Sequence, residues 1–261
     1  MHIQEQFISY QEHQIYTKQW IVDVEQTLSP IVLLHESLGS TELWKDFPEV
    51  LAEKLQRNVI SYDRIGFGQS SAVNESVKLS FIADEVIPLT YILDALNIQS
   101  CILLGHSVGG GMAVAIASIL KTRCKAVVTV AAQAYVEEET IEGVRYAAEN
   151  VCTNPKFIDS LARYHGTKTQ WVLDGWTKTW LNPEFKTWNT APFLAELECL
   201  LLVLHGDDDP YATLAQPEYF INQAKTKQKI SHILRGCGHF PHREKQDKVL
   251  QTLEIFLRSI Q

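Results

Sequence analysis

A serine between two glycines is the feature of this sequence that most directly suggests chemistry. Gly105-His106-Ser107-Val108-Gly109 follows the apolar run 100–104 and precedes a second apolar run, 112–117. A Gly-x-Ser-x-Gly pattern in that setting predicts a sharp turn from strand to helix that lifts the serine hydroxyl clear of the sheet. The N-terminus of the following helix would stabilise negative charge that develops beside Ser107. The alternative is a serine in an ordinary glycine-rich turn.

A nucleophilic serine needs a base and an acid, and two loops supply candidates. A serine hydroxyl reacts poorly until a neighbouring base takes its proton, and that base is usually a histidine oriented by a carboxylate. Asp209 lies in a loop after the apolar run 199–204, and His239 lies in a loop after the run 230–234. The chain order serine, aspartate, histidine is one of the orders in which such triads occur. Asp208 is the alternative acid and His242 the alternative base.

The elements that must bring these side chains together follow from hydrophobic periodicity. The predicted strands are 6–10, 14–22, 30–35, 58–62, 100–104, 125–131, 199–205 and 230–234, and helices are expected over about 43–55 and 80–96, after Ser107, and over 245–260. Continuous apolar strands that alternate with helices predict an α/β fold, a mostly parallel twisted sheet of about eight strands with helices on both faces. Ligands of such sheets bind at the carboxyl ends of the strands, where both loops and the serine turn are expected.

The alternation of strands and helices stops between residues 134 and 190. This segment contains helical patches, an acidic start, and four of the six tryptophans, namely Trp171, Trp176, Trp180 and Trp188. We interpret it as a helical insertion that lies over one end of the sheet. Its tryptophans either line a binding pocket or pack the insertion onto the core.

Composition excludes several classes of partner. The net charge of −8 disfavours nucleic acid and anionic membranes. The first twenty residues contain no apolar core of signal-peptide length, and no apolar run approaches the length of a membrane span. The five cysteines are scattered and odd in number, without a Cys-x-x-Cys pair. A disulfide framework or zinc site is therefore not expected, and a reducing cytoplasm fits best. We expect a small-molecule substrate, no cofactor or metal, and a monomer or homodimer.

Taken together, the motifs resemble the α/β-hydrolase superfamily. The matching stretches are 32–35, Tyr62-Asp63-Arg64-Ile65-Gly66-Phe67-Gly68-Gln69-Ser70, 105–110, His205-Gly206-Asp207-Asp208-Asp209 and Gly236-Cys237-Gly238-His239. The resemblance implies a core of residues 1–133 and 191–261, with 134–190 as a helical cap, or lid, between the sixth and seventh strands. Through the family pattern Gly-x-x-Asp it also implies a catalytic triad of Ser107, Asp209 and His239.

The resemblance further implies an oxyanion hole formed by two backbone N–H groups, those of Val108 and Ser37. One residue departs from the family pattern, because Glu36 stands where glycine is expected. A carboxylate that pointed inward would oppose the oxyanion, so we expect Glu36 to face away and to pair with a cation such as Arg64. The N–H of Leu38 is a possible substitute for the second donor.

Other residues near these motifs receive provisional roles. His35 and His106 are expected to fix loops by hydrogen bonds, and Cys237 to be a buried, inert thiol. Candidate substrate contacts are Leu38, His106, Trp176, Trp180 and Phe240.

The hypothesis that follows is a serine hydrolase that cleaves an ester or thioester of a small to medium apolar substrate through an acyl-enzyme. Hydrolysis of a carbon–carbon bond in a diketone uses the same triad and is the alternative reaction. A non-catalytic ligand-binding protein on the same fold is the alternative from another class. Haloalkane and epoxide hydrolysis are set aside because they require a carboxylate nucleophile, whereas position 107 is serine.

Overall fold

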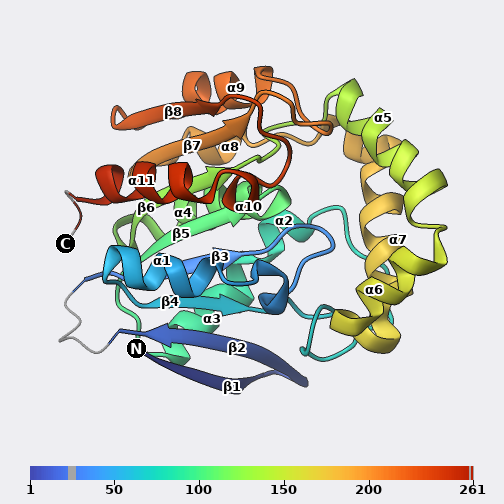
Figure 1. Ribbon diagram of the computed structural model, residues 1–261, viewed down its shortest axis with the longest axis horizontal. Helices are drawn as coiled ribbons and strands as arrows, with labels where there is room; N and C mark the ends of the chain where they lie inside the picture. The colour runs from blue at the N-terminus through green and yellow to red at the C-terminus, as the bar shows by residue number, and fades with distance from the viewer. Residues whose placement is uncertain (23–27, 259, 261) are drawn as a thin grey trace.

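The centre of the molecule is one eight-stranded sheet in the order β1-β2-β4-β3-β5-β6-β7-β8 (Figure 1). It is seen in a computed structural model that describes residues 1–22, 28–258 and 260. The strands are β1 His2–Tyr10, β2 His13–Ile21, β3 Ile31–Leu34, β4 Val59–Tyr62, β5 Cys101–His106, β6 Cys124–Val130, β7 Leu200–Gly206 and β8 Lys229–Leu234. β1 and β2 form an antiparallel ribbon joined to β4, and the remaining neighbours are parallel. The predicted fold class is confirmed.

Helices cover both faces of this sheet. α1 (Phe47–Leu55) and α11 (Gln246–Leu257) pack on one face, while α3 (Val86–Ala95), α4 (Val108–Leu120) and α9 (Ala215–Gln223) pack on the other (Figure 1). Every residue of β3, β4 and β5 is consequently buried. This double cover explains why these strands are continuous apolar runs rather than alternating ones.

One predicted helix is in fact two. The expected helix over about 80–96 is divided into α2 (Phe81–Asp84) and α3. Pro88 has no N–H to donate to the carbonyl of Asp84, and its ring crowds that carbonyl, so the helix cannot run through without a break.

The residues between β6 and β7 fold into helices at the end of the sheet where the parallel strands finish (Figure 1). They are α5 (Glu138–Tyr146), the π-helical turn η3 (Ala147–Val151), α6 (Pro155–His165), η4 (Gly166–Lys168), α7 (Thr169–Trp180), η5 (Pro183–Thr187) and α8 (Ala191–Leu194). The two ends of the segment meet, because Tyr135 and Asn189 form an isolated bridge and Thr190 N donates to Ala134 O at 2.7 Å. The division into core and cap stays a prediction.

Three short helices complete the elements, η1 (Thr41–Trp44), η2 (Lys121–Arg123) and α10 (Pro241–Glu244). Within the described part of the chain, no helix has both the length and the apolar composition that crossing a bilayer requires.

Candidate active site

Ser107 lies on a strained turn between β5 and α4. Its φ of 53° and ψ of −126° are rare for a residue other than glycine, and its N–H donates to Val130 O at 2.9 Å. A Cβ at position 105 would lie 2.0 Å from Gly109 O, and one at position 109 would lie 2.2 Å from Leu34 O. Both obstacles are backbone atoms that cannot move aside. The two glycines therefore permit the close crossing that forces the serine onto this turn.

His239 and Asp209 form a short, buried hydrogen bond. His239 Nδ1 is 2.8 Å from Asp209 Oδ2, and the Asp209 side chain is fully buried. Burial raises the pKa of the Asp209 carboxyl, but the adjacent His239 and a hydrogen bond from Tyr211 N outweigh it, so the pKa lies below its usual value. The alternative acid, Asp208, is exposed. The geometry thus favours Asp209 as the partner of His239.

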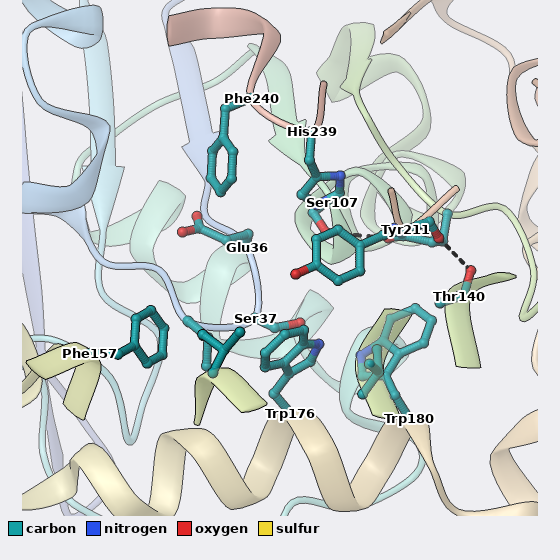
Figure 2. A pocket seen from close by; sticks show the side chains of 14 residues that line it. Glu36, Ser37, Ser107, Thr140, Phe157, Trp176, Trp180, Tyr211, His239 and Phe240 are labelled. Atoms are coloured by element: carbon teal, nitrogen blue, oxygen red, sulfur yellow. Dashed lines mark hydrogen bonds between the residues drawn. The ribbon is translucent and has the colours of Figure 1, made fainter. Parts of the chain in front are cut away.

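Ser107 and His239 line the same cavity, and Figure 2 shows the serine beside the imidazole ring. The Ser107 hydroxyl donates a hydrogen bond to Gln133 Oε1 at 3.3 Å. Gln133 follows β6, is buried, and lines the cavity with the other two residues. The Ser107 hydroxyl is therefore directed at Gln133, and it must turn toward His239 before that histidine can accept its proton.

The alternative base, His242, is buried away from this cavity. Its ring packs 4.9 Å from the ring of Trp44 and 5.4 Å from the ring of Phe47. Burial holds its pKa well below the usual value, so the ring is neutral.

Burial also raises the pKa of the Cys237 thiol to about 11, which keeps that cysteine protonated and unreactive.

Of the two predicted oxyanion donors, one follows the serine directly in the chain and the other lines the same cavity. Val108 is the first residue of α4, where a backbone N–H has no acceptor within the helix, and Ser37 lines the cavity. The predicted pairing of the Glu36 carboxylate with Arg64 is wrong. Arg64 Nη2 instead donates to the backbone carbonyl of Glu36 at 2.8 Å, while the carboxylate lies 3.6 Å from His106 Nδ1.

The cavity has a volume of about 210 Å³, and five of its fourteen lining residues are Phe, Tyr or Trp. Four of the five predicted substrate contacts line it, namely Leu38, Trp176, Trp180 and Phe240. His106, the fifth, lies behind the wall with its side chain fully buried, and its Nε2 donates to His239 O at 2.7 Å. It therefore fixes a loop, as was also expected, and does not reach the cavity.

Comparison with known proteins identifies the family to which this fold belongs. A family model described as "alpha/beta hydrolase fold" matches residues 29–246. The chain belongs to this family. Among α/β-hydrolase relatives, 3-oxoadipate enol-lactonase 1 of Acinetobacter baylyi is 26% identical over 255 residues, covering 89% of this chain and 90% of the relative. Esterase YbfF of Escherichia coli is 24% identical over 247 residues, covering 88% of this chain and 93% of the relative.

A solved structure shows the same fold at lower sequence identity. Proline iminopeptidase of Mycobacterium smegmatis superposes with a TM-score of 0.77 at 19% identity, over 97% of each chain.

Several residues of this α/β-hydrolase cavity were not predicted from the sequence. They are Gln133, Thr140, Val144, Val151, Phe157 and Tyr211. Tyr211 packs against the His239 ring, with centroids 4.9 Å apart, and its position two residues after Asp209 was an available signal. Phe157 and Val144 had no such signal, because only the folding of the 134–190 segment brings them to the cavity.

Proposed function

We propose that the protein is a serine hydrolase that cleaves a carboxylic ester or thioester of a small to medium apolar substrate. The observation that carries the proposal is the buried 2.8 Å contact between His239 and Asp209, in a cavity shared with Ser107 on its strained turn. Membership of the α/β-hydrolase family supports hydrolysis in general. The relatives named as an enol-lactonase and an esterase support ester-type bonds in particular.

The proposed reaction proceeds in two half-reactions. In the first, His239 Nε2 accepts the Ser107 proton as Oγ attacks the substrate carbonyl, and Asp209 stabilises the resulting imidazolium. The N–H groups of Val108 and Ser37 bind the tetrahedral oxyanion, and His239 returns its proton to the leaving alcohol or thiol. In the second, His239 deprotonates a water molecule that attacks the acyl-enzyme, and the acid departs as Ser107 regains its proton.

The shape of the site supports a substrate with two apolar parts. A second cavity of about 380 Å³ shares Ser37, Trp176 and Trp180 with the cavity that contains the serine. These three residues stand between two mainly apolar spaces, so one space suits the acyl group and the other suits the leaving group.

The test is a series of p-nitrophenyl esters of increasing acyl length, assayed with wild type and Ser107→Ala. We expect hydrolysis of short and medium chains, a decline once the chain outgrows the cavity, and a loss of roughly 10⁴-fold or more in kcat for the variant. Diketone cleavage without ester hydrolysis would favour the carbon–carbon hydrolase. The absence of both activities would favour a binding protein.

A further inference from the structure

The Glu36 carboxylate, which departs from the family pattern, occupies a defined place beside the proposed oxyanion site. It lines the cavity, but Figure 2 shows it pointing away from Ser107. Only 16% of the Glu36 side chain is exposed. Its Oε2 lies so close to Gly39 that a Cβ added to this glycine would be 2.4 Å from the oxygen. Arg64 fixes the backbone by donating to the Glu36 carbonyl. The carboxylate is therefore held toward His106.

The hydrogen bonds of His106 determine the protonation of one of its two ring nitrogens, Nε2. His106 Nε2 lies 2.7 Å from the backbone oxygen of His239, and a carbonyl oxygen only accepts hydrogen bonds. Nε2 therefore carries a hydrogen. In a neutral ring, Nδ1 would then be an unprotonated acceptor, and this is the atom that faces Glu36 Oε2 at 3.6 Å.

Two acceptors opposed in this way would be unfavourable in a buried site. The His106 side chain is fully buried, and among the described residues its Nδ1 has no hydrogen-bond partner. An ionised carboxylate facing a bare nitrogen would lose solvation and gain no partner. A single proton, on either atom, converts the opposed pair into a donor and an acceptor.

We propose that Glu36 and His106 hold one proton between them, and that Glu36 acts as a positioning residue that keeps His106 and the His239 carbonyl in place. With this proton the pair has no net charge, so it does not oppose an oxyanion bound by the neighbouring Ser37 N–H. The inference rests on the proposed function and adds a role for the residue that replaces the family's glycine.

The other titratable groups around the pair do not replace this proton. Burial lowers the pKa of His35, His165 and His242, which keeps these rings neutral. Burial also lowers the pKa of His106, although the facing Glu36 carboxylate raises it, and His106 in turn lowers the pKa of Glu36. Arg64 is engaged by the Glu36 carbonyl and by His35. His239, whose ring centroid is 5.1 Å from that of His106, is engaged by Asp209. Loss of the shared proton as the pH rises would therefore leave a net negative charge on the pair, beside the oxyanion site, and lower kcat.

The first test measures the proton directly by ¹⁵N NMR of the imidazole nitrogens in the wild-type protein. We expect His106 Nδ1 to show, at neutral pH, the shift of a nitrogen that carries or accepts a proton, and to change in Glu36→Ala. A shift typical of an unprotonated, unbonded nitrogen, unaffected by residue 36, would overturn the inference. This measurement requires no enzymatic activity.

The second test is kinetic and compares Glu36→Gln with Glu36→Ala. A glutamine amide can donate to Nδ1 without a titrating proton, so Glu36→Gln should keep kcat within about threefold of wild type and lose the decline with rising pH. Glu36→Ala should lower kcat by roughly tenfold with little change in KM. Losses of this size are typical when a partner that orients a functional histidine is removed. Glu53→Gln, an exposed glutamate on α1, is the matched charge control and should behave as wild type.

Equal kcat values and pH profiles in wild type and both Glu36 variants would contradict the inference. The proposed function is tested separately by labelling Ser107 with a fluorophosphonate. Labelling together with an unprotonated His106 Nδ1 would refute only the shared proton. A shared proton in a protein that is neither labelled nor active would refute only the hydrolase.

Discussion

At the scale of single residues, the proposed chemistry depends on a carboxylate that must stay ionised while buried. Asp209 accepts from Tyr211 N at 2.9 Å through Oδ1 and contacts His239 Nδ1 at 2.8 Å through Oδ2. His205 Nε2 lies 3.7 Å from the same Oδ2. These contacts outweigh the burial that raises the pKa of the carboxyl, and the net pKa is lowered.

Replacing Asp209 by asparagine tests this residue in two ways. We expect kcat to fall by roughly 10⁴-fold, because the amide no longer selects the tautomer in which His239 Nε2 is free to accept a proton. Ester hydrolysis at saturating substrate measures this change. A loss of less than about tenfold would remove Asp209 from the mechanism.

The same variant carries a prediction about stability and pH. A carboxyl whose pKa is lower in the folded state stabilises the fold above its unfolded pKa, near 3.8, and loses that contribution as pH falls through the folded pKa. The free energy of unfolding of wild type should therefore fall more steeply below about pH 4 than that of Asp209→Asn. Urea denaturation at a series of pH values measures the difference, and parallel curves would contradict the lowered pKa.

At the scale of elements, the junction of α6 and α7 holds two loops of the sheet in place. Lys168 Nζ donates to the carbonyls of Phe67, Gly68 and Ser70. His165 accepts from Gly68 N at 2.9 Å through Nδ1 and donates to Leu38 O at 3.0 Å through Nε2. The 134–190 segment is thereby attached to the loop that contains Ser37, the proposed second oxyanion donor.

Lys168→Met should loosen this attachment. The change leaves three carbonyls without their donor and should lower the free energy of unfolding by about 2 kcal/mol. Amide exchange within residues 66–70 should also accelerate. Lys178→Met, on α7, is the matched control, because Lys178 is 75% exposed and pairs with Asp174, so its loss should cost less than about 0.5 kcal/mol. Equal effects of the two variants would contradict the proposed attachment.

At the scale of the whole molecule, one buried arginine joins segments more than 200 residues apart. Arg57, which follows α1, donates to Ser29 O at 3.0 Å, to the carbonyl of Leu257, the last residue of α11, and to the carbonyl of Ile260 beyond it. The Arg57 side chain is nearly inaccessible to water. If it were removed, the three carbonyls would lose their donor and water would not fully replace it.

Arg57→Ala should therefore destabilise the fold by about 2 to 3 kcal/mol. Lys54→Ala is the control, since Lys54 is half exposed and its 3.5 Å ion pair with Glu254 contributes less than about 1 kcal/mol. Urea denaturation of both variants provides the comparison. If Lys54→Ala cost as much as Arg57→Ala, burial of the arginine would not be the cause.

The sequence predicted the features that depend on local pattern. Buried strands such as β5 are continuous apolar runs, and the glycines at 105 and 109 mark the turn at Ser107, so both could be placed without coordinates. The residues that were missed depend on contacts between distant segments. Gln133 and Phe157 come to line the cavity that contains the serine only after the chain folds. Glu36 faces His106, 70 positions away, although charge alone favoured Arg64.

The central claim is that Ser107 is an activated nucleophile. The most direct measurement is mass spectrometry of the protein after reaction with a fluorophosphonate probe, with Ser107→Ala treated in parallel. The account predicts one adduct, on the peptide that contains Ser107, and none on the variant. An unlabelled wild type, or an adduct that persists in the variant, would contradict it.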